Sequence, residues 1–361
     1  MIKKIEQKYD FLRTLTAIAI SMLITLVIVT LVSNDPIEAL TSFLTGPLQS
    51  ARRIGNVIEM AIPLSFTGVA ICIMFEANQF NCAGEGAFFL GSVAAAAIAI
   101  NWILPAGVHQ VVILLLSGLV GACICAIPAV LKLLWQADVL VSSLMLNYLC
   151  LFGGLYVVNY YLIDPAAGFL ASQPFLKTAK LPVIIPGTRI HLGLIILALC
   201  IVFAYVFLYK SRRGYALRMV GKNENFAKYT GVGVTAAIVG SQLVGGFICG
   251  AAGGVEMMGM FTRFQYQALP QYGFDGIIIA TLANNKPQLV PLAAVFLAYV
   301  RCGADVLSRT TDVPVEIVSI IQAIAVIFVA AKLFLNRYKQ RAIEKAANHK
   351  MAEEKGVATN V

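Results

Sequence analysis

Long apolar segments, separated by short polar ones, dominate this chain of 361 residues. Nine of them approach or exceed the roughly 20 apolar residues that a helix needs to cross a bilayer. These segments cover residues 11–33, 57–75, 87–101, 107–131, 139–162, 190–209, 231–258, 288–304 and 313–335. The pattern predicts an all-α protein, a polytopic transmembrane helical bundle with about 9–10 spans.

Two interruptions of this pattern predict broken helices. Residues 75–86 (FEANQFNCAGEG) place acidic, amide and glycine residues between two apolar segments. The apolar segment at 272–283, bounded by Gly273 and by residues 284–287, is too short for a relaxed span. Irregular backbone at membrane depth occurs only inside protein or beside a water-filled cavity, and transporters commonly place solute sites there.

The charges predict the orientation of the chain. Only 12% of residues are charged, about half the share in a soluble domain. Residues 210–228 hold six cations and one acid, which places them in the cytoplasm. The basic ends point the same way, whereas Arg52 and Arg53 would lie outside. We therefore expect a cytoplasmic N-terminus at 1–10, a transmembrane domain at 11–335 with a cytoplasmic loop at 210–230, and a cytoplasmic tail at 336–361.

The net charge of +9 does not indicate a nucleic-acid partner, because the cations gather at the ends of the predicted spans. The sequence around Gly221 lacks the upstream glycine and the Ser or Thr of a phosphate-binding loop. Three scattered histidines and eight cysteines, mostly in apolar segments, predict neither a metal site nor a catalytic site. We expect no enzyme activity and no cofactor, so that any ATP hydrolysis comes from a partner.

Three acidic residues lie within the predicted membrane region beside glycine or other small residues: Glu85, Glu256 and Asp275. Intramembrane acids are costly and commonly mark solute or ion pathways. An acid near a helix N-terminus is, however, also stabilised by the helix dipole without any ligand. The sequence leaves both interpretations open.

Glycines recur every four residues along one face of the segment at 231–258, at Gly246, Gly250 and Gly254. Small residues at this spacing allow two helices to approach closely. We therefore predict close helix packing, either within the chain or across a dimer interface.

Several segments together resemble one family. Residues 63–88 (PLSFTGVAICIMFEANQFNCAGEGAF), 127–149 (ending in MLNYL), 214–232 (GYALRMVGKNENFAKYTGV), 273–287 (GFDGIIIATLANNKP) and 313–331 follow the order of motifs in nucleoside-type ABC importer permeases. These permeases form part of the branched-chain amino acid and ribose permease superfamily. The chain departs from the pattern at Cys82, Ala87, residues 225–227 and residues 283–284, which leaves the exact solute open.

The resemblance implies a permease subunit in the bacterial cytoplasmic membrane, without an ATPase of its own. It implies as partners two cytoplasmic ATP-binding subunits, a second, paralogous permease, an external solute-binding protein and membrane lipid. The solute would be a nucleoside, with a sugar or a flavin as alternatives. An ion-coupled secondary transporter, using the three intramembrane acids, is the competing interpretation.

This hypothesis assigns roles to two groups of residues. The predicted solute path contains Asn81, Glu85, Asn147, Tyr148 and Asp275. The predicted contact with the ATPase contains Gly214, Arg218, Gly221, Asn223, Tyr229 and Gly231.

Overall fold

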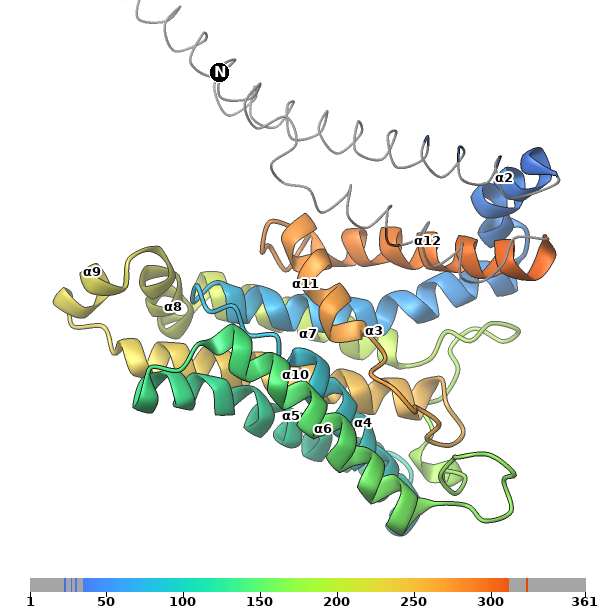
Figure 1. Ribbon diagram of the computed structural model, residues 1–361, viewed down its shortest axis with the longest axis horizontal. Helices are drawn as coiled ribbons and strands as arrows, with labels where there is room; N and C mark the ends of the chain where they lie inside the picture. The colour runs from blue at the N-terminus through green and yellow to red at the C-terminus, as the bar shows by residue number, and fades with distance from the viewer. Residues whose placement is uncertain (1–22, 24–26, 28–29, 31–34, 312–322, 324–361) are drawn as a thin grey trace, which may run out of the picture. The chain divides into compact units, whose positions relative to one another are not determined.

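A computed structural model describes residues 35–311 and positions 23, 27, 30 and 323 (Figure 1). Most of the predicted spans at 11–33 and 313–335 lies outside these residues. Within the described part, seven helices are long and apolar enough to cross a membrane. They are α3 (Ala51–Phe75), α4 (Gly84–Asn101), α5 (Val108–Trp135), α6 (Val139–Val157, continued by a π-helical turn to Leu162), α7 (Gly193–Lys210), α10 (Val234–Gly259) and α12 (Val290–Thr310). The predicted all-α membrane fold is confirmed.

The contacts divide the chain into two compact units. One consists of residues 48–299, and the other of residues 1–47 and 300–361. In the larger unit, α10 packs against α3, α4 and α5, while α6 lies beside α4 and α7 beside α3. The described part of the smaller unit contains α2 (Pro36–Thr45) and the second half of α12, which meet where Gly46 lies against Val306.

Helix α3 begins at Ala51, six residues before the predicted span at 57–75. The reason is local, because Ser50 caps the helix and its side-chain oxygen accepts a hydrogen bond from the amide of Arg53 at 3.2 Å. Arg52 and Arg53 therefore extend the helix beyond its apolar segment.

The glycine face of α10 packs against α5 of the same chain. A Cβ atom on Gly246 would meet the carbonyl of Gly121, and one on Gly250 would meet the carbonyl of Ser117. A Cβ atom on Gly254 would lie 2.5 Å from the Ser117 hydroxyl. Only glycine allows the two backbones to come this close.

The segment between α6 and α7 has no α-helix and only a 3-10 turn at Lys177–Ala179. It is joined to the segment after α10, since the Ser172 amide donates to the Phe264 carbonyl at 2.9 Å and Arg263 pairs with Asp164 at 3.3 Å. This loop lies at the end of the larger unit opposite α8 and α9 (Figure 1).

Candidate functional site

The first break separates α3 from α4. Helix α3 ends at Phe75, Glu76 forms its C-cap, and α4 begins only at Gly84. Asn78 adopts a left-handed conformation with φ of 53°, a conformation that asparagine tolerates better than most residues. Residues 76–83 are therefore irregular, as the sequence predicts.

Asn81 anchors this break to two neighbouring helices. Its amide nitrogen donates to the Cys125 carbonyl on α5 and to the Gln242 side chain on α10, both at 2.9 Å. Its oxygen accepts from the Ala83 amide at 2.9 Å. The side chain is fully buried, so these bonds satisfy polar groups that water does not reach.

Asn147 anchors the end of the same break to α6. Its oxygen accepts from the Gly86 amide at 2.9 Å, and its nitrogen donates to the Cys82 carbonyl at 3.0 Å. One turn earlier on α6, the Ser143 hydroxyl accepts from the Cys82 amide at 3.0 Å. The buried edge of α6 thus supplies the hydrogen bonds that the irregular backbone cannot make internally.

The second break precedes the short helix α11 (Tyr272–Leu282). The Glu85 carboxylate, in the first turn of α4, accepts hydrogen bonds from the amides of Gln271 at 2.6 Å, Gly273 at 2.6 Å and Phe274 at 3.3 Å. Gly273 lies directly against the backbone of Glu85, where a side chain would collide. We call this meeting of two helix N-termini around one carboxylate the Glu85 junction.

The Glu85 junction lies near the middle of the membrane-spanning region. A Cβ atom on the adjacent Gly84 would lie 3.3 Å from the sulfur of Cys249. Cys249 lies about 22 Å from the start of α10, which is about 39 Å long. Each helix N-terminus carries a partial positive charge, which the Glu85 carboxylate and the buried Asp275, in the first turn of α11, counterbalance.

The structure therefore separates the residues of the predicted solute path. Asn81, Glu85 and Asn147 direct their hydrogen bonds to protein groups at the two breaks, so the geometry supports a structural role for them. Tyr148 follows Asn147 but lies on the outward face of α6, 61% exposed. Contact of any of these residues with a solute stays a prediction.

The predicted cytoplasmic loop folds into two short helices, α8 (Arg212–Lys222) and α9 (Glu224–Tyr229). Ser211 caps α8 by accepting from the Gly214 amide at 2.9 Å. Asn223 ends α8 and caps α9 by accepting from the Phe226 amide at 2.9 Å. Asn223 thus divides the segment into two helices.

The two glycines of α8 allow close contacts with the membrane helices. A Cβ atom on Gly221 would collide with the Glu76 carbonyl, and one on Gly214 would collide with the Phe207 carbonyl. The Arg218 guanidinium lies 5.2 Å from the centre of the Tyr209 ring, a cation–π distance. Gly221 therefore joins α8 directly to the first break.

Electrostatic interactions reinforce this contact. Glu76 is half-buried, and this burial raises its pKa, whereas Arg218 and Lys222 of α8 oppose the rise. Further along the break, the Lys132 ammonium donates to the Gln79 side chain at 2.7 Å. The sequence does not distinguish Gln79, Ser143 and Gln242, although the spacing of Ser143 and Asn147 marks one face of a helix.

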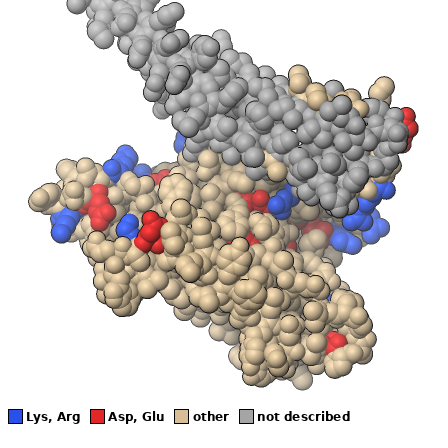
Figure 2. Space-filling view, viewed as in Figure 1, with Lys and Arg blue, Asp and Glu red and all other residues tan. Residues whose placement is uncertain are grey.

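The outer surface of α8 and α9 is accessible. Tyr229 is 91% exposed, and Gly231 follows it with φ of 80°. Beside them lies a groove of about 220 Å³, and Figure 2 shows Lys and Arg side chains interspersed with acidic ones at this end of the unit. The groove is lined by Tyr215, Arg218, Met219, Lys222, Asn223 and Phe226.

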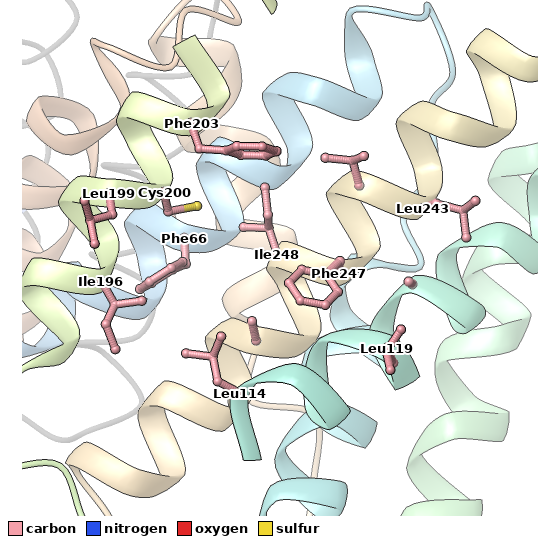
Figure 3. A pocket seen from close by; sticks show the side chains of 13 residues that line it. Phe66, Leu114, Leu119, Ile196, Leu199, Cys200, Phe203, Leu243, Phe247 and Ile248 are labelled. Atoms are coloured by element: carbon pink, nitrogen blue, oxygen red, sulfur yellow. The ribbon is translucent and has the colours of Figure 1, made fainter. Parts of the chain in front are cut away.

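A cavity of about 600 Å³ lies among α3, α5, α7 and α10 (Figure 3). It is lined by aliphatic and aromatic side chains and by Cys200, so its side chains offer no hydrogen-bonding nitrogen or oxygen. This lining does not suit a polar solute. Among the residues that the structure describes, no group of three or more His, Cys, Asp or Glu side chains could hold a metal ion.

Comparison with known proteins identifies the family. Residues 53–330 match the model described as "Branched-chain amino acid transport system / permease component". The guanosine ABC transporter permease protein NupP of Bacillus subtilis is 30% identical over 298 residues, which cover 82% of this chain and 86% of the relative. The glucose ABC transporter permease protein TsgB13 of Haloferax volcanii is 29% identical over 315 residues, 84% of this chain and 83% of the relative.

The nucleoside ABC transporter permease protein NupB of Lactococcus lactis subsp. cremoris is 24% identical over 332 residues, which cover 89% of this chain and 91% of the relative. No solved structure matches the chain. The match over 53–330, together with seven helices long enough to span a membrane, shows that this multi-pass membrane protein belongs to the branched-chain amino acid permease family of ABC transporters.

Proposed function

We propose that the chain is one of two permease subunits of an ATP-driven nucleoside importer in the bacterial cytoplasmic membrane. The relatives NupP and NupB are named as guanosine and nucleoside permeases, which supports a nucleoside as the transported solute. The relative TsgB13 is named as a glucose permease, so a sugar is the alternative solute. The observation that carries the proposal is the Glu85 junction. Transporters with broken helices commonly direct helix N-termini at anionic groups of the solute. Here two such N-termini meet the Glu85 carboxylate of the protein itself, which favours a neutral solute.

The exposed face of α6 suits the flat base of a nucleoside. Tyr148, Phe152 and Tyr156 are all exposed on this helix, and they provide aromatic surface with hydroxyl groups at its edge. We place the solute path along this face, covered on the other side by a second, paralogous permease. Tyr148 would then stack on the base, while the Glu85 junction keeps the supporting helices in place.

The ATP-binding subunits would dock on α8 and α9, with Tyr229 and the groove beside it as contacts. Movement of α8 would pass through the contact between Gly221 and Glu76 to residues 76–83. From there it would reach α5 and α10 through Asn81, and α11 through Glu85. The external solute-binding protein would deliver its cargo at the opposite end of the unit.

The test is uptake into proteoliposomes that contain this chain with its neighbouring permease and ATP-binding subunits. ATP is enclosed, and the binding protein with labelled guanosine, or labelled glucose in a parallel sample, is added outside. We expect guanosine uptake that requires ATP. Glucose uptake without guanosine uptake would show that the solute is a sugar and not a nucleoside. Uptake by this chain alone under an ion gradient would contradict its assignment to an ATP-driven transporter.

A variant tests the position of the path. Tyr148→Leu removes the aromatic ring, and Tyr148→Phe keeps it while removing the hydroxyl. Because stacking on a base contributes about 1–3 kcal/mol, we expect Tyr148→Leu to raise the half-saturating nucleoside concentration about tenfold, and Tyr148→Phe to change it little. Equal values for the two variants and the parent would exclude Tyr148 from the path.

A further inference from the structure

A second feature of the larger unit is a groove between α7 and α10. A second cavity, of about 420 Å³, lies next to the apolar cavity of about 600 Å³. The two share Val244 on α10, and on α7 they are bordered by Phe203 and Phe207, whose rings stack with centres 5.9 Å apart. We call the whole depression the α7–α10 groove.

The two ends of the α7–α10 groove differ in chemistry. The inner end, shown in Figure 3, presents only aliphatic, aromatic and thiol side chains. The other end includes Arg213 of α8, Ser241 and the N-terminus of α10 at Gly233. Gly233 provides no side-chain cap, so the first amides of α10 and the dipole of this long helix add to the positive charge.

The groove passes the midpoint of both helices. Its α7 wall runs from Phe207 to Ile196, which is about 16 Å of helix, and its α10 wall runs from Gly233 to Ala251, which is about 27 Å. Half of a hydrocarbon core about 30 Å thick is about 15 Å. An acyl chain of a single leaflet therefore has room along the groove, starting from the end that holds Arg213.

The groove is also open. A Cβ atom on Gly240, which lines the charged end, would have no neighbour within 4 Å. Only 22% of the apolar helix α7 is buried, so most of its side chains face away from the described part of the chain. Nothing within the described residues fills the space between the two helices.

We propose that the α7–α10 groove binds an anionic glycerophospholipid of the cytoplasmic leaflet. Its phosphate lies at Arg213 and the N-terminus of α10, and one acyl chain extends along Phe207 and Phe203 into the apolar end. Charge complementarity identifies this occupant, because the groove has its cation at the membrane surface and hydrocarbon-like walls at membrane depth.

The position of this lipid gives it a role in transport. Helix α7 leads directly into α8, and α10 carries Gln242, which holds Asn81 of the first break. A lipid between α7 and α10 therefore sets the spacing between the helix pair that contacts the ATPase and the helix that supports the break. This role rests on the proposed coupling function, whereas lipid binding itself does not.

The test uses the complete transporter in nanodiscs that contain trace phosphatidylglycerol or phosphatidylcholine with a photoreactive group in the acyl chain. Crosslinked peptides are identified by mass spectrometry. We expect phosphatidylglycerol to label residues 196–207 and 240–248 several times more strongly than phosphatidylcholine does. Equal labelling by both lipids, labelling of α6 as strong as that of α7 and α10, or crosslinks in which a protein segment occupies the groove would overturn the proposal.

Two variants and one control sharpen this experiment. Arg213→Gln should reduce the preference for phosphatidylglycerol about fivefold, the effect of one cation near an anionic surface. Gly240→Trp, which has room for its side chain, should reduce labelling by both lipids. Arg212→Gln removes a neighbouring cation that does not line the groove, and should leave the preference unchanged. An equal loss in Arg212→Gln and Arg213→Gln would refute a specific site even if nucleoside uptake is normal.

Discussion

Replacing Glu85 by alanine should separate the two interpretations that the sequence leaves open for the intramembrane acids. The substitution leaves three amides of the second break without their acceptor, namely the buried amide of Gly273 and the partly buried amides of Gln271 and Phe274. An unsatisfied buried amide costs about 1–3 kcal/mol. Because the Gln271 and Phe274 amides are only partly buried and the Phe274 bond is long at 3.3 Å, we expect a total loss of about 2–5 kcal/mol in the free energy of unfolding.

The variant Glu85→Gln tests how much one of these hydrogen bonds contributes to the free energy of unfolding. Glutamine keeps one oxygen, which can accept from the Gly273 and Phe274 amides, while its NH₂ group faces the Gln271 amide. One short hydrogen bond is then lost, at a cost of about 1–3 kcal/mol. Glu224→Ala is the control, because Glu224 also lies in the first turn of a helix but is exposed. Its effect should stay within about 0.5 kcal/mol.

The assay is denaturant unfolding in detergent micelles, followed with a thiol-reactive dye. The chain suits this dye because, of its eight free cysteines, only Cys123 is exposed and Cys200 is half-buried. If Glu85→Ala unfolds at the same denaturant concentration as Glu224→Ala, the Glu85 junction does not hold the breaks. Normal stability combined with lost uptake would instead favour direct contact of Glu85 with the solute.

Three further predictions use the same reporter or the uptake assay. Gly221→Val should abolish uptake while ATP hydrolysis continues, because its side chain collides with the Glu76 carbonyl; unchanged uptake would refute the coupling role. Gly250→Ala should cost about 1–3 kcal/mol of stability, whereas Gly240→Ala on the same helix, where a Cβ meets open space, should be neutral or stabilising; equal effects would contradict the packing. Since burial raises the pKa of Glu76, its protonated form favours folding, and this contribution is lost as the pH rises through the raised pKa. The free energy of unfolding, measured from about pH 4 upward, should therefore decrease more steeply with pH for the parent than for Glu76→Gln. The same pH dependence in both proteins would refute this.

The sequence predicts the membrane helices and both breaks well, because apolar length and glycine or amide residues act locally. It also contains the signal for a boundary between α8 and α9, since Asn223 is a good N-cap residue followed by Glu224. The partner of Glu85 could not be predicted in this way. The carboxylate binds backbone amides 186 to 189 residues away, and only the tertiary fold brings them together.

The same limit applies to Asn147 and Tyr148, which the sequence places in one solute path. Adjacent residues on a helix point about 100° apart. Ser143, Asn147, Cys150 and Gly154 are buried at the spacing of one helix face, and Tyr148 falls outside that face. A helical projection could have separated the two roles, but it could not have shown which face is buried.

The glycine contacts of α10 have a consequence for how the transporter changes shape. Gly250 meets the backbone of α5 at Ser117 and Gly121 on one side and that of α4 at Gly91 on the other. Helices in backbone contact on both flanks cannot slide or rotate past one another without collisions. We therefore expect α4, α5 and α10 to move as one rigid body. An alternating-access cycle must then take its displacement from the more loosely packed α6 and α7 and from the hinge residues at the two breaks.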